Sequence, residues 1–329
     1  MVTLHDLNSK LKICESVSLV CPACHGELML EKPYRRLNRI RTGELHCVKG
    51  CAVFPIIYGV PVMLMPGQSA DFPMFYQPDW KAFFLQHGKE KLMEKVDSGY
   101  FDNEIKVSGP SVDEKMLREI KKIISSVGWQ RFLRKDNTSS KDADAVAISK
   151  RLGRLKSGVV MDIGCGGGFT TERVLLETDP SIFAITLEMD FLAAKVTEKR
   201  IEKLEMSNRN IGICADARHM PFTDESLMAS YTRNGFNEFR HYAKAVKEAH
   251  RVLKKDGHLI ITNPKLSRWL EYPQRFGMNH EEQRQILRRL GYFHGIEGFM
   301  DDVKQAGFKI SALEDIPEME SAVILEAVK

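Results

Sequence analysis

The chain of 329 residues lacks long uncharged apolar runs, because no stretch approaches the ~18 residues that a membrane-spanning helix needs. Its first residues, MVTLHDLNSKLK, lack the apolar core of a signal peptide. Internal repeats and low-complexity tracts are also missing. We therefore expect a globular protein of the cytoplasm without a membrane span, and the length favours more than one domain.

A strong excess of one charge sign is missing as well, since the net charge is +4. Residues 1–68 carry eight Lys and Arg against five Asp and Glu, whereas the rest of the chain carries 40 against 39. Proteins that bind nucleic acid over a broad surface are usually more basic than this. The charge permits an RNA partner but does not favour one.

Cysteines are scarce beyond residue 51, because five of the seven lie before that point. An exported disulfide scaffold would be shorter and would spread its cysteines along the chain. The five clustered cysteines include two close pairs, in the segments CPAC and CVKGC, and 22 residues separate the pairs. Each pair can present two thiolates from one turn, and four thiolates favour zinc or iron. The spacing predicts a structural zinc ion bound by Cys21, Cys24, Cys47 and Cys51. Alternative ligands for one position are Cys14, His25 and His46.

Three regions follow from the pattern of residues along the chain. Residues 1–67 hold the cysteine pairs and end in an apolar, proline-punctuated run that predicts short strands. Residues 68–138 have the apolar spacing of helices and form a candidate connector or substrate cap. Residues 139–329 alternate apolar strands with amphipathic stretches, as βαβ units around a parallel sheet do. The strands are expected near residues 159–163, 182–187, 210–214, 227–232, 258–262, 308–315 and 321–328.

The last two of these strands are separated only by the segment IPEME. A connection this short cannot hold a crossover helix, so the final pair should be antiparallel. We therefore predict an α/β protein with a mostly parallel sheet that ends in a hairpin.

A glycine-dense turn follows the first strand of this region, in the segment VVMDIGCGGGF. Glycines permit positive φ and a close backbone approach, and the next helix offers free N–H groups at its start. A dinucleotide could use the same arrangement. Asp162, placed before the first glycine, suits the charged amino acid portion of S-adenosylmethionine (SAM) better than a phosphate.

Two further acids follow the next two strands. Glu188 ends the second strand, where an acid can accept both hydroxyls of a ribose. Asp216 follows the third strand, where it can bind an adenine edge while Met220 or Phe222 covers the ring. Either acid alone would be an ordinary loop residue, but three acids at three successive strand ends favour a nucleoside cofactor.

Residues ~140–329 resemble the class I SAM-dependent methyltransferases, particularly the type 11 and quinone-type enzymes. The matching segments are VMDIGCGGGF, ADARHMPFTDES, EAHRVLKKDGHLIITNP and the closing GFKISALEDI and SAVILEAVK. The resemblance implies a Rossmann-like sheet of seven strands with an antiparallel last strand. It also implies that Asp162, Gly164, Gly166 and Gly168 line the methionine end of SAM, Glu188 the ribose, Asp216 and Ala217 the adenine, and Asn234 the sulfonium. Their neighbours Cys165 and Met189 complete the expected cofactor site.

Residues 21–65 resemble a Trm112-like zinc ribbon in the segments CPACHGEL and FPIIYGVPVML. Free-standing relatives bind and activate methyltransferases, so the resemblance implies a built-in partner with a docking or structural role. The order of zinc site and methyltransferase also resembles ribosomal RNA guanine methyltransferases, although the Cys-x3-Cys second pair departs from them. A basic run, Arg35 to Arg41, could contact phosphates or form a solvated loop.

The methyl acceptor is open at this point, and a small molecule is favoured. RNA or a protein side chain remains an alternative, and so does a SAM-binding scaffold without transfer activity. Amino-group methyltransferases often carry an Asn/Asp-Pro-Pro-Tyr/Phe motif after the fourth strand, where this chain has TRNGFN. None of the candidate general bases stands out, and they are Tyr231, His241, Tyr272 and His280.

Overall fold

The computed structural model describes residues 1–9, 17–65, 86–88, 90–91, 94–95, 142–266 and 279–329, except Phe239 and Glu320. At Leu192 and Glu238 it describes the backbone only. The predicted connector therefore lies almost wholly outside the described residues, and its helical character stays a prediction. No helix of the described residues is long and apolar enough to cross a membrane.

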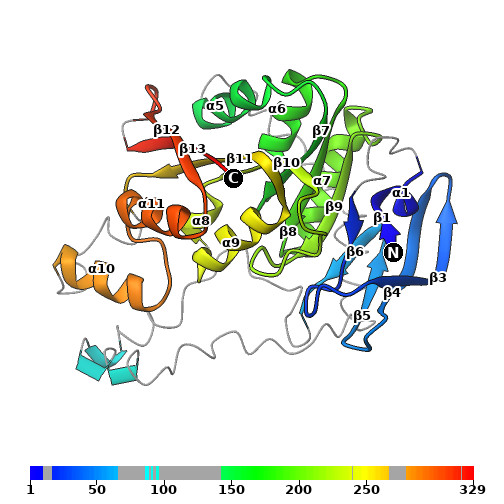
Figure 1. The fold of residues 1–329 in the computed structure, drawn as a ribbon, viewed down its shortest axis with the longest axis horizontal. Helices are drawn as coiled ribbons and strands as arrows, with labels where there is room; N and C mark the ends of the chain where they lie inside the picture. Colours follow the sequence, from blue (N-terminus) through cyan, green and yellow to red (C-terminus); the bar gives the residue numbers. More distant parts are fainter. Residues whose placement is uncertain are drawn as a thin grey trace.

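Seven strands from residues 158–328 form the core of one large sheet (Figure 1). Their order is β12-β13-β11-β10-β7-β8-β9. The strands are β7 (Gly158–Ile163), β8 (Ile182–Glu188), β9 (Asn210–Ala215), β10 (Leu227–Arg233), β11 (Leu253–Pro264), β12 (Lys309–Asp315) and β13 (Ala322–Val328). The α/β class and the strand positions predicted from sequence are confirmed.

The five strands β9, β8, β7, β10 and β11 are parallel to one another, whereas β13 is antiparallel to both β11 and β12. The predicted antiparallel ending is confirmed. The parallel strands are buried on both faces, as expected for a sheet covered by crossover helices. In β7 the side chains alternate, with Val159 and Met161 in one apolar cluster and Val160 in the other.

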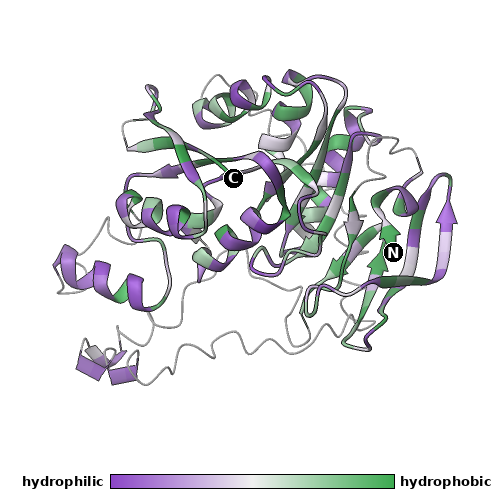
Figure 2. Ribbon diagram, in the orientation of Figure 1, coloured by the Kyte–Doolittle hydropathy of each residue, from purple (hydrophilic) through white to green (hydrophobic). Residues whose placement is uncertain are grey.

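Helices cover both faces of this sheet (Figure 1). Apolar residues of α5 and α6 pack in one cluster, and those of α9 and α11 pack in the other. Figure 2 shows hydrophobic central strands and a mostly hydrophilic α10. The helices are α5 (Ala143–Leu152), α6 (Phe169–Glu177), α7 (Phe191–Lys203), α8 (Gly235–Glu238), α9 (Tyr242–Val252), α10 (His280–Arg289) and α11 (Ile296–Gln305).

The N-terminal module, residues 1–65, is β-rich as predicted. Its elements are β1 (Val2–Thr3), α1 (Leu4–Leu7), β2 (Ser18–Leu19), β3 (Leu28–Arg36), β4 (Arg39–Cys47), β5 (Val53–Ile57) and β6 (Val60–Met63). β3 to β6 form an antiparallel meander. β3 is exposed along most of its length and is largely hydrophilic in Figure 2.

The module joins the large sheet by strand addition, since β6 pairs with β9 in parallel, with Val62 opposite Cys214 and Met63 opposite Ala215. Among the described residues the sheet therefore has eleven strands, in the order β12-β13-β11-β10-β7-β8-β9-β6-β5-β4-β3. The predicted sheet of seven strands corresponds to residues 158–328 and not to the whole sheet. The strands of the N-terminal module thus continue the large sheet.

A second contact runs between β2 and the loop after β9. Leu19 forms a bridge with Phe222, the N–H of Val20 donates to the Pro221 carbonyl at 3.0 Å, and the N–H of Thr223 donates to Ser18 at 3.2 Å. One apolar cluster includes residues of both the N-terminal module and the large sheet. The two parts therefore share a core.

Candidate cofactor site and cysteine cluster

The residues that the sequence predicts for a cofactor follow four neighbouring parallel strands. β10, β7, β8 and β9 lie side by side in that order. β7 ends before the glycine turn, residues 164–168; β8 ends at Glu188; Asp216 follows β9; and Asn234 follows β10. Parallel strands end at the same edge of a sheet, so the four segments meet there. We call this the cofactor edge.

The glycine turn requires its glycines for two different reasons. Gly164, Gly166 and Gly168 have φ values of 70°, 51° and 76°, in the left-handed region that favours glycine. A Cβ on Gly168 would lie 2.5 Å from Cγ2 of Thr197, whereas a Cβ on Gly166 would meet no atom within 4 Å. Packing therefore fixes Gly168, and the backbone of Gly166 borders open space that a ligand can enter.

The carboxylate of Glu188 joins the glycine turn to the start of α7. Its Oε2 accepts the N–H of Gly166 at 2.8 Å, and its Oε1 accepts the N–H groups of Met189 at 2.8 Å and Asp190 at 3.1 Å. Glu188 is half-buried, and burial raises the pKa of its carboxyl. A carboxylate has about four acceptor positions, so Glu188 retains acceptor capacity for ligand hydroxyls.

Asp216 is buried and forms a bidentate pair with Arg218. Nε of Arg218 lies 2.9 Å from both carboxylate oxygens, and the Arg218 N–H also donates to Oδ1 at 2.9 Å. Ala217, between them, is buried too. Sequence reasoning missed Arg218, although its spacing of two from Asp216 is short enough to have suggested the pair.

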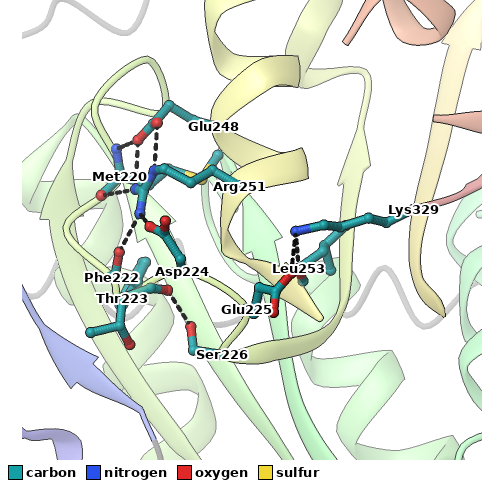
Figure 3. A network of polar contacts seen from close by, with 10 residues as sticks. All are labelled: Met220, Phe222, Thr223, Asp224, Glu225, Ser226, Glu248, Arg251, Leu253 and Lys329. Carbon is teal, nitrogen blue, oxygen red and sulfur yellow. Dashed lines mark hydrogen bonds and ion pairs between the residues drawn. The ribbon is translucent and has the colours of Figure 1, made fainter. Parts of the chain in front are cut away.

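The loop after Asp216 is anchored to α9 by Arg251 (Figure 3). Arg251 donates to the carbonyl oxygens of Met220 and Phe222 at 2.8 and 2.7 Å and pairs with Glu248 at 2.7 Å. Glu248 in turn accepts the N–H of Met220 at 2.8 Å. Charge-assisted hydrogen bonds are about twice as strong as neutral ones, so this network holds the loop firmly.

Met220 and Phe222 were expected to cover an adenine ring at the cofactor edge, and their side chains lie elsewhere. Both side chains are fully buried in the apolar cluster that includes residues of the N-terminal module, where Phe222 pairs with Leu19. The expectation that one of them covers an adenine ring is therefore not supported by their placement.

Asp162 lies beneath the glycine turn and is 1 % exposed. Its Oδ2 accepts the hydroxyl proton of Thr171, at 2.5 Å, and burial raises the pKa of Asp162 to about 7. The adjacent Cys165 is also buried, with Sγ 3.6 Å from Oγ1 of Thr197. The Asp162 side chain therefore bonds the first turn of α6 and does not face solvent.

Asn234 directly follows β10 and has a left-handed backbone conformation, with φ of 60°. Its N–H donates to the Thr262 carbonyl at 2.8 Å. The residue before it, Arg233, pairs with Asp142 at 2.8 Å and with Asp144 at 2.6 Å. These pairs fix the start of α5 at the cofactor edge. The role of Arg233 was not evident from the sequence, because its partners lie about ninety residues away.

The four candidate bases occupy different environments. Tyr231 is fully buried beside Asp162, and burial raises the pKa of its hydroxyl well above the usual range, which makes it a poor base. His241 is half-buried at the start of α9, and its backbone N–H donates to Gly291 at 2.6 Å. His280 is exposed at the start of α10. Tyr272 lies outside the described residues.

Residues 161–261 match a family model described as a methyltransferase domain. The match begins inside β7, ends inside β11, and contains the glycine turn, Glu188, Asp216 and Asn234. These residues form a methyltransferase domain.

Curated relatives of the methyltransferase domain include quinone-pathway proteins. The ubiquinone/menaquinone biosynthesis C-methyltransferase UbiE of Bartonella henselae is 31% identical over 101 residues, which is 31% of this chain and 39% of that protein. The demethylmenaquinone methyltransferase of Thermotoga maritima is 30% identical over 102 residues, 31% of this chain and 42% of that protein. The chain thus spans less than half the length of these relatives.

Solved structures similar to the chain include a SAM dependent methyltransferase from Aquifex aeolicus. It is 16% identical, with a TM-score of 0.45, and the similarity covers 61% of this chain and 97% of that one.

The four cysteines of the two pairs come together in the N-terminal module. Their sulfur atoms all lie within 4.8 Å of one another, and those of Cys24 and Cys47 are 3.6 Å apart. Each pair sits on a tight turn, because the His25 N–H donates to Cys21 at 2.8 Å and the Gly50 N–H donates to Cys47 at 2.9 Å. The donor set and the two turns fit a tetrahedral zinc site.

The alternative zinc ligands are less suited to the site. His46 contacts Glu44 at 2.9 Å and Glu31 at 3.6 Å, so its ring is engaged by these carboxylates. The ring of His25 is not among the ligand atoms that cluster with the four sulfur atoms. Cys14 lies outside the described residues. The four-cysteine set remains the best candidate.

The cysteine cluster and the basic run lie at opposite edges of the sheet. β6 is parallel to β9, and β5 reverses the chain, so β4 runs in the same direction as β9. Cys47 at the end of β4 therefore lies toward the cofactor edge. Arg36 and Arg39, at the turn between β3 and β4, lie toward the opposite edge.

Helix α7 supplies two contacts to the glycine turn that sequence reasoning missed. The Thr197 hydroxyl donates to the Gly166 carbonyl at 2.9 Å, and Nε of Arg200 donates to the Gly167 carbonyl at 2.8 Å. Arg200 also lies 3.7 Å from the ring centre of Phe169. The spacing of three on one helix was the available signal, because such residues share a face.

Proposed function

We propose that the protein transfers a methyl group from SAM to a small-molecule acceptor. The observation that carries this proposal is the gathering of the glycine turn, Glu188, Asp216 and Asn234 at one sheet edge, around open space at Gly166. When bound there, SAM supplies an electrophilic methyl group on a sulfonium. The curated relatives are named as methyltransferases of quinone biosynthesis, and this favours a small apolar acceptor.

Each cofactor residue receives a role that fits its contacts. Glu188 uses its remaining acceptor capacity, about one position, for the ribose, while Asp216 and Ala217 bind the adenine edge. The N–H groups of the glycine turn hold the amino acid end, and the buried Asp162 supports that site through its bond to Thr171 at the start of α6. Gly164, Cys165, Gly168 and Met189 shape the backbone around it, and Asn234 lies nearest the reacting sulfonium.

The acceptor side is proposed from the same geometry. Methyl transfer is an in-line displacement, so the protein must align two reactants and exclude water, and it needs a base only for a protonated acceptor. Among the described candidates, His241 and His280 remain eligible as bases. RNA as the acceptor loses support, because Arg36 and Arg39 lie toward the edge opposite the cofactor.

We further propose that Cys21, Cys24, Cys47 and Cys51 hold a structural Zn²⁺ in a Trm112-like ribbon, residues 1–67. Zinc stabilises small modules that cannot fold on apolar burial alone. Thiolate ligands of this kind persist in a reducing compartment, which agrees with the cytoplasmic location expected from the sequence. Residues 68–138 and 139–329 then form the connector and the catalytic part.

The test is to measure SAM affinity by calorimetry and then to incubate the protein with methyl-labelled SAM and a fractionated cell extract. We expect label in a small-metabolite fraction. Glu188→Gln should abolish both signals, whereas Glu202→Gln, an exposed acid on α7, should leave them unchanged. Label in RNA or protein would show that the acceptor is a macromolecule and not a small molecule. SAM binding with neither methyl transfer nor slow SAM hydrolysis would indicate a scaffold.

A further inference from the structure

Helix α7 contacts the N-terminal module with one set of side chains and the glycine turn with another. Phe191 and Ala194 pack in an apolar cluster with Ile57, Val60 and Val62 of the N-terminal module. Lys195 and Glu198 continue the same helical face, because residues spaced three and four apart on a helix are neighbours. The helix is therefore fixed to the module along more than one turn.

A buried group of charges forms the polar part of this contact. Glu198 of α7 pairs with Arg39 of β4 and with Lys195. Glu198 and Lys195 are buried, and Arg39 is half-buried. Nζ of Lys195 also donates to the Tyr58 carbonyl at 2.6 Å, and Nη2 of Arg39 donates to Gly59 at 3.1 Å. Lys195 is 1 % exposed and Glu198 is 6 % exposed, so these ion pairs are shielded from water.

Thr197 lies between these two charged residues in the sequence and faces the other way. It is fully buried and donates to the Gly166 carbonyl, and its Cγ2 limits the space at Gly168. A shift or rotation of α7 would move Thr197 and the charged pair together. The orientation of the helix therefore links Arg39 to the backbone of the glycine turn.

We propose that Arg39 is a positioning residue for the cofactor site, which it maintains by fixing Glu198 and, through α7, the glycine turn. The proposal rests on the proposed function, because it requires that SAM binds at this turn. Docking of the module alone does not need these charges, since strand pairing between β6 and β9 and the apolar cluster already join the two parts. Buried ion pairs often add little net stability, but they are directional.

The experiment compares SAM dissociation constants of full-length variants by calorimetry. Arg39→Met removes the charge while keeping the length of the side chain, and Arg39→Lys restores a cation. The matched control is Arg36→Met, because Arg36 is an exposed arginine of the same hairpin. We expect Arg39→Met to weaken SAM binding about 10-fold, within the usual range of coupling between sites. Arg39→Lys should recover part of the loss, and Arg36→Met should bind normally.

Amide hydrogen exchange of the ligand-free protein separates positioning from general destabilisation. In Arg39→Met, residues 164–168 and 191–203 should exchange faster, while the strand pair β11–β13 stays protected. If Arg39→Met does not fold, Lys195→Met replaces it, since it keeps the Arg39–Glu198 pair and removes the bonds of Lys195 to Glu198 and to the Tyr58 carbonyl. We then expect a smaller loss of the same kind.

Unchanged SAM affinity and unchanged exchange in the folded variants would overturn the positioning role while leaving the proposed function intact. Absence of SAM binding by the unmodified protein would instead refute the proposed function, and the positioning role with it. Equal loss of affinity in Arg36→Met would attribute the effect to the charge of the hairpin and overturn the specific role of Arg39.

Discussion

The N-terminal module and the methyltransferase domain share one sheet, but different interactions hold them. In the domain, the parallel strands are buried on both faces between helices. In the module, β3 is mostly exposed, the four thiols lie close together, and Arg39 pairs with Glu198 of α7. The difference teaches that a continuous sheet does not imply uniform stability along its width.

Loss of the proposed zinc site should have the largest effect, and it should destabilise the module much more than the domain. Zinc binding contributes on the order of 10 kcal/mol in small zinc domains, so Cys47→Ser should release the metal and unfold β3 to β5. The domain should keep its helices. Metal analysis and amide exchange check both statements, with Cys214→Ala as the control that retains zinc. Full metal content in Cys47→Ser would contradict the four-cysteine site.

Removal of the shared anion should have the next largest effect. Glu198→Gln removes the anion that Arg39 and Lys195 share and leaves each cation with its bond to a backbone carbonyl of the module. Breaking a buried pair costs about 3–5 kcal/mol. Chemical denaturation measures the change in the free energy of unfolding. Glu202→Gln, on the exposed side of α7, should change it by less than about 0.5 kcal/mol. Similar changes in the free energy of unfolding for both variants would show that the pairs of Glu198 with Arg39 and Lys195 contribute no more than an exposed ion pair.

A pH-dependent prediction concerns Asp162 of the domain. Burial raises its pKa to about 7, so the folded state binds more protons than the unfolded chain between about pH 4 and pH 7. The stability that this proton contributes is therefore lost as the pH rises through that window.

Asp162→Asn should remove this loss. At about 1.4 kcal/mol per pKa unit, the unmodified protein should lose about 3 kcal/mol more than Asp162→Asn between pH 5 and pH 7.5. Denaturation curves at both pH values measure the difference, with the exposed Asp301→Asn as control. Parallel pH profiles for the unmodified protein and Asp162→Asn would refute the assignment.

The smallest change in stability should come from Gly166→Val, which nevertheless should abolish SAM binding. Open space surrounds the position, and a left-handed residue other than glycine costs only about 1–2 kcal/mol. Gly166→Ala should weaken binding less than Gly166→Val. Calorimetry reports affinity and thermal unfolding reports stability, and unchanged affinity in Gly166→Val would remove the glycine turn from the site.

Much of the domain was predictable because its strands are apolar runs between polar helices. The strand near residues 182–187 was found at Ile182–Glu188, and the final hairpin followed from its short connection. β11 begins at Leu253, earlier than the predicted residue 258. The prediction missed this start because the first residues of the strand include the polar Lys254 and Asp256. Local sequence therefore located the strand ends that carry the predicted cofactor residues.

The contacts between distant segments were not predictable from one sequence. The pairing of β6 with β9 joins strands about 150 residues apart, and either strand alone has an ordinary apolar pattern. Arg39 is one of several arginines in its hairpin, and only the packing of α7 selects it as the partner of Glu198. Which strands and side chains pair across the interface depends on the folded arrangement, and such pairing produces no periodic pattern in the sequence.

The strand pairing of β6 with β9 has a practical consequence. A shortened chain that began at α5 would leave the backbone N–H and C=O groups along that side of β9 without partners. Strands exposed in this way pair readily with other chains, and the apolar faces of β9 would favour self-association. The two parts should therefore be produced and purified as one polypeptide, because the module also protects the domain from aggregation.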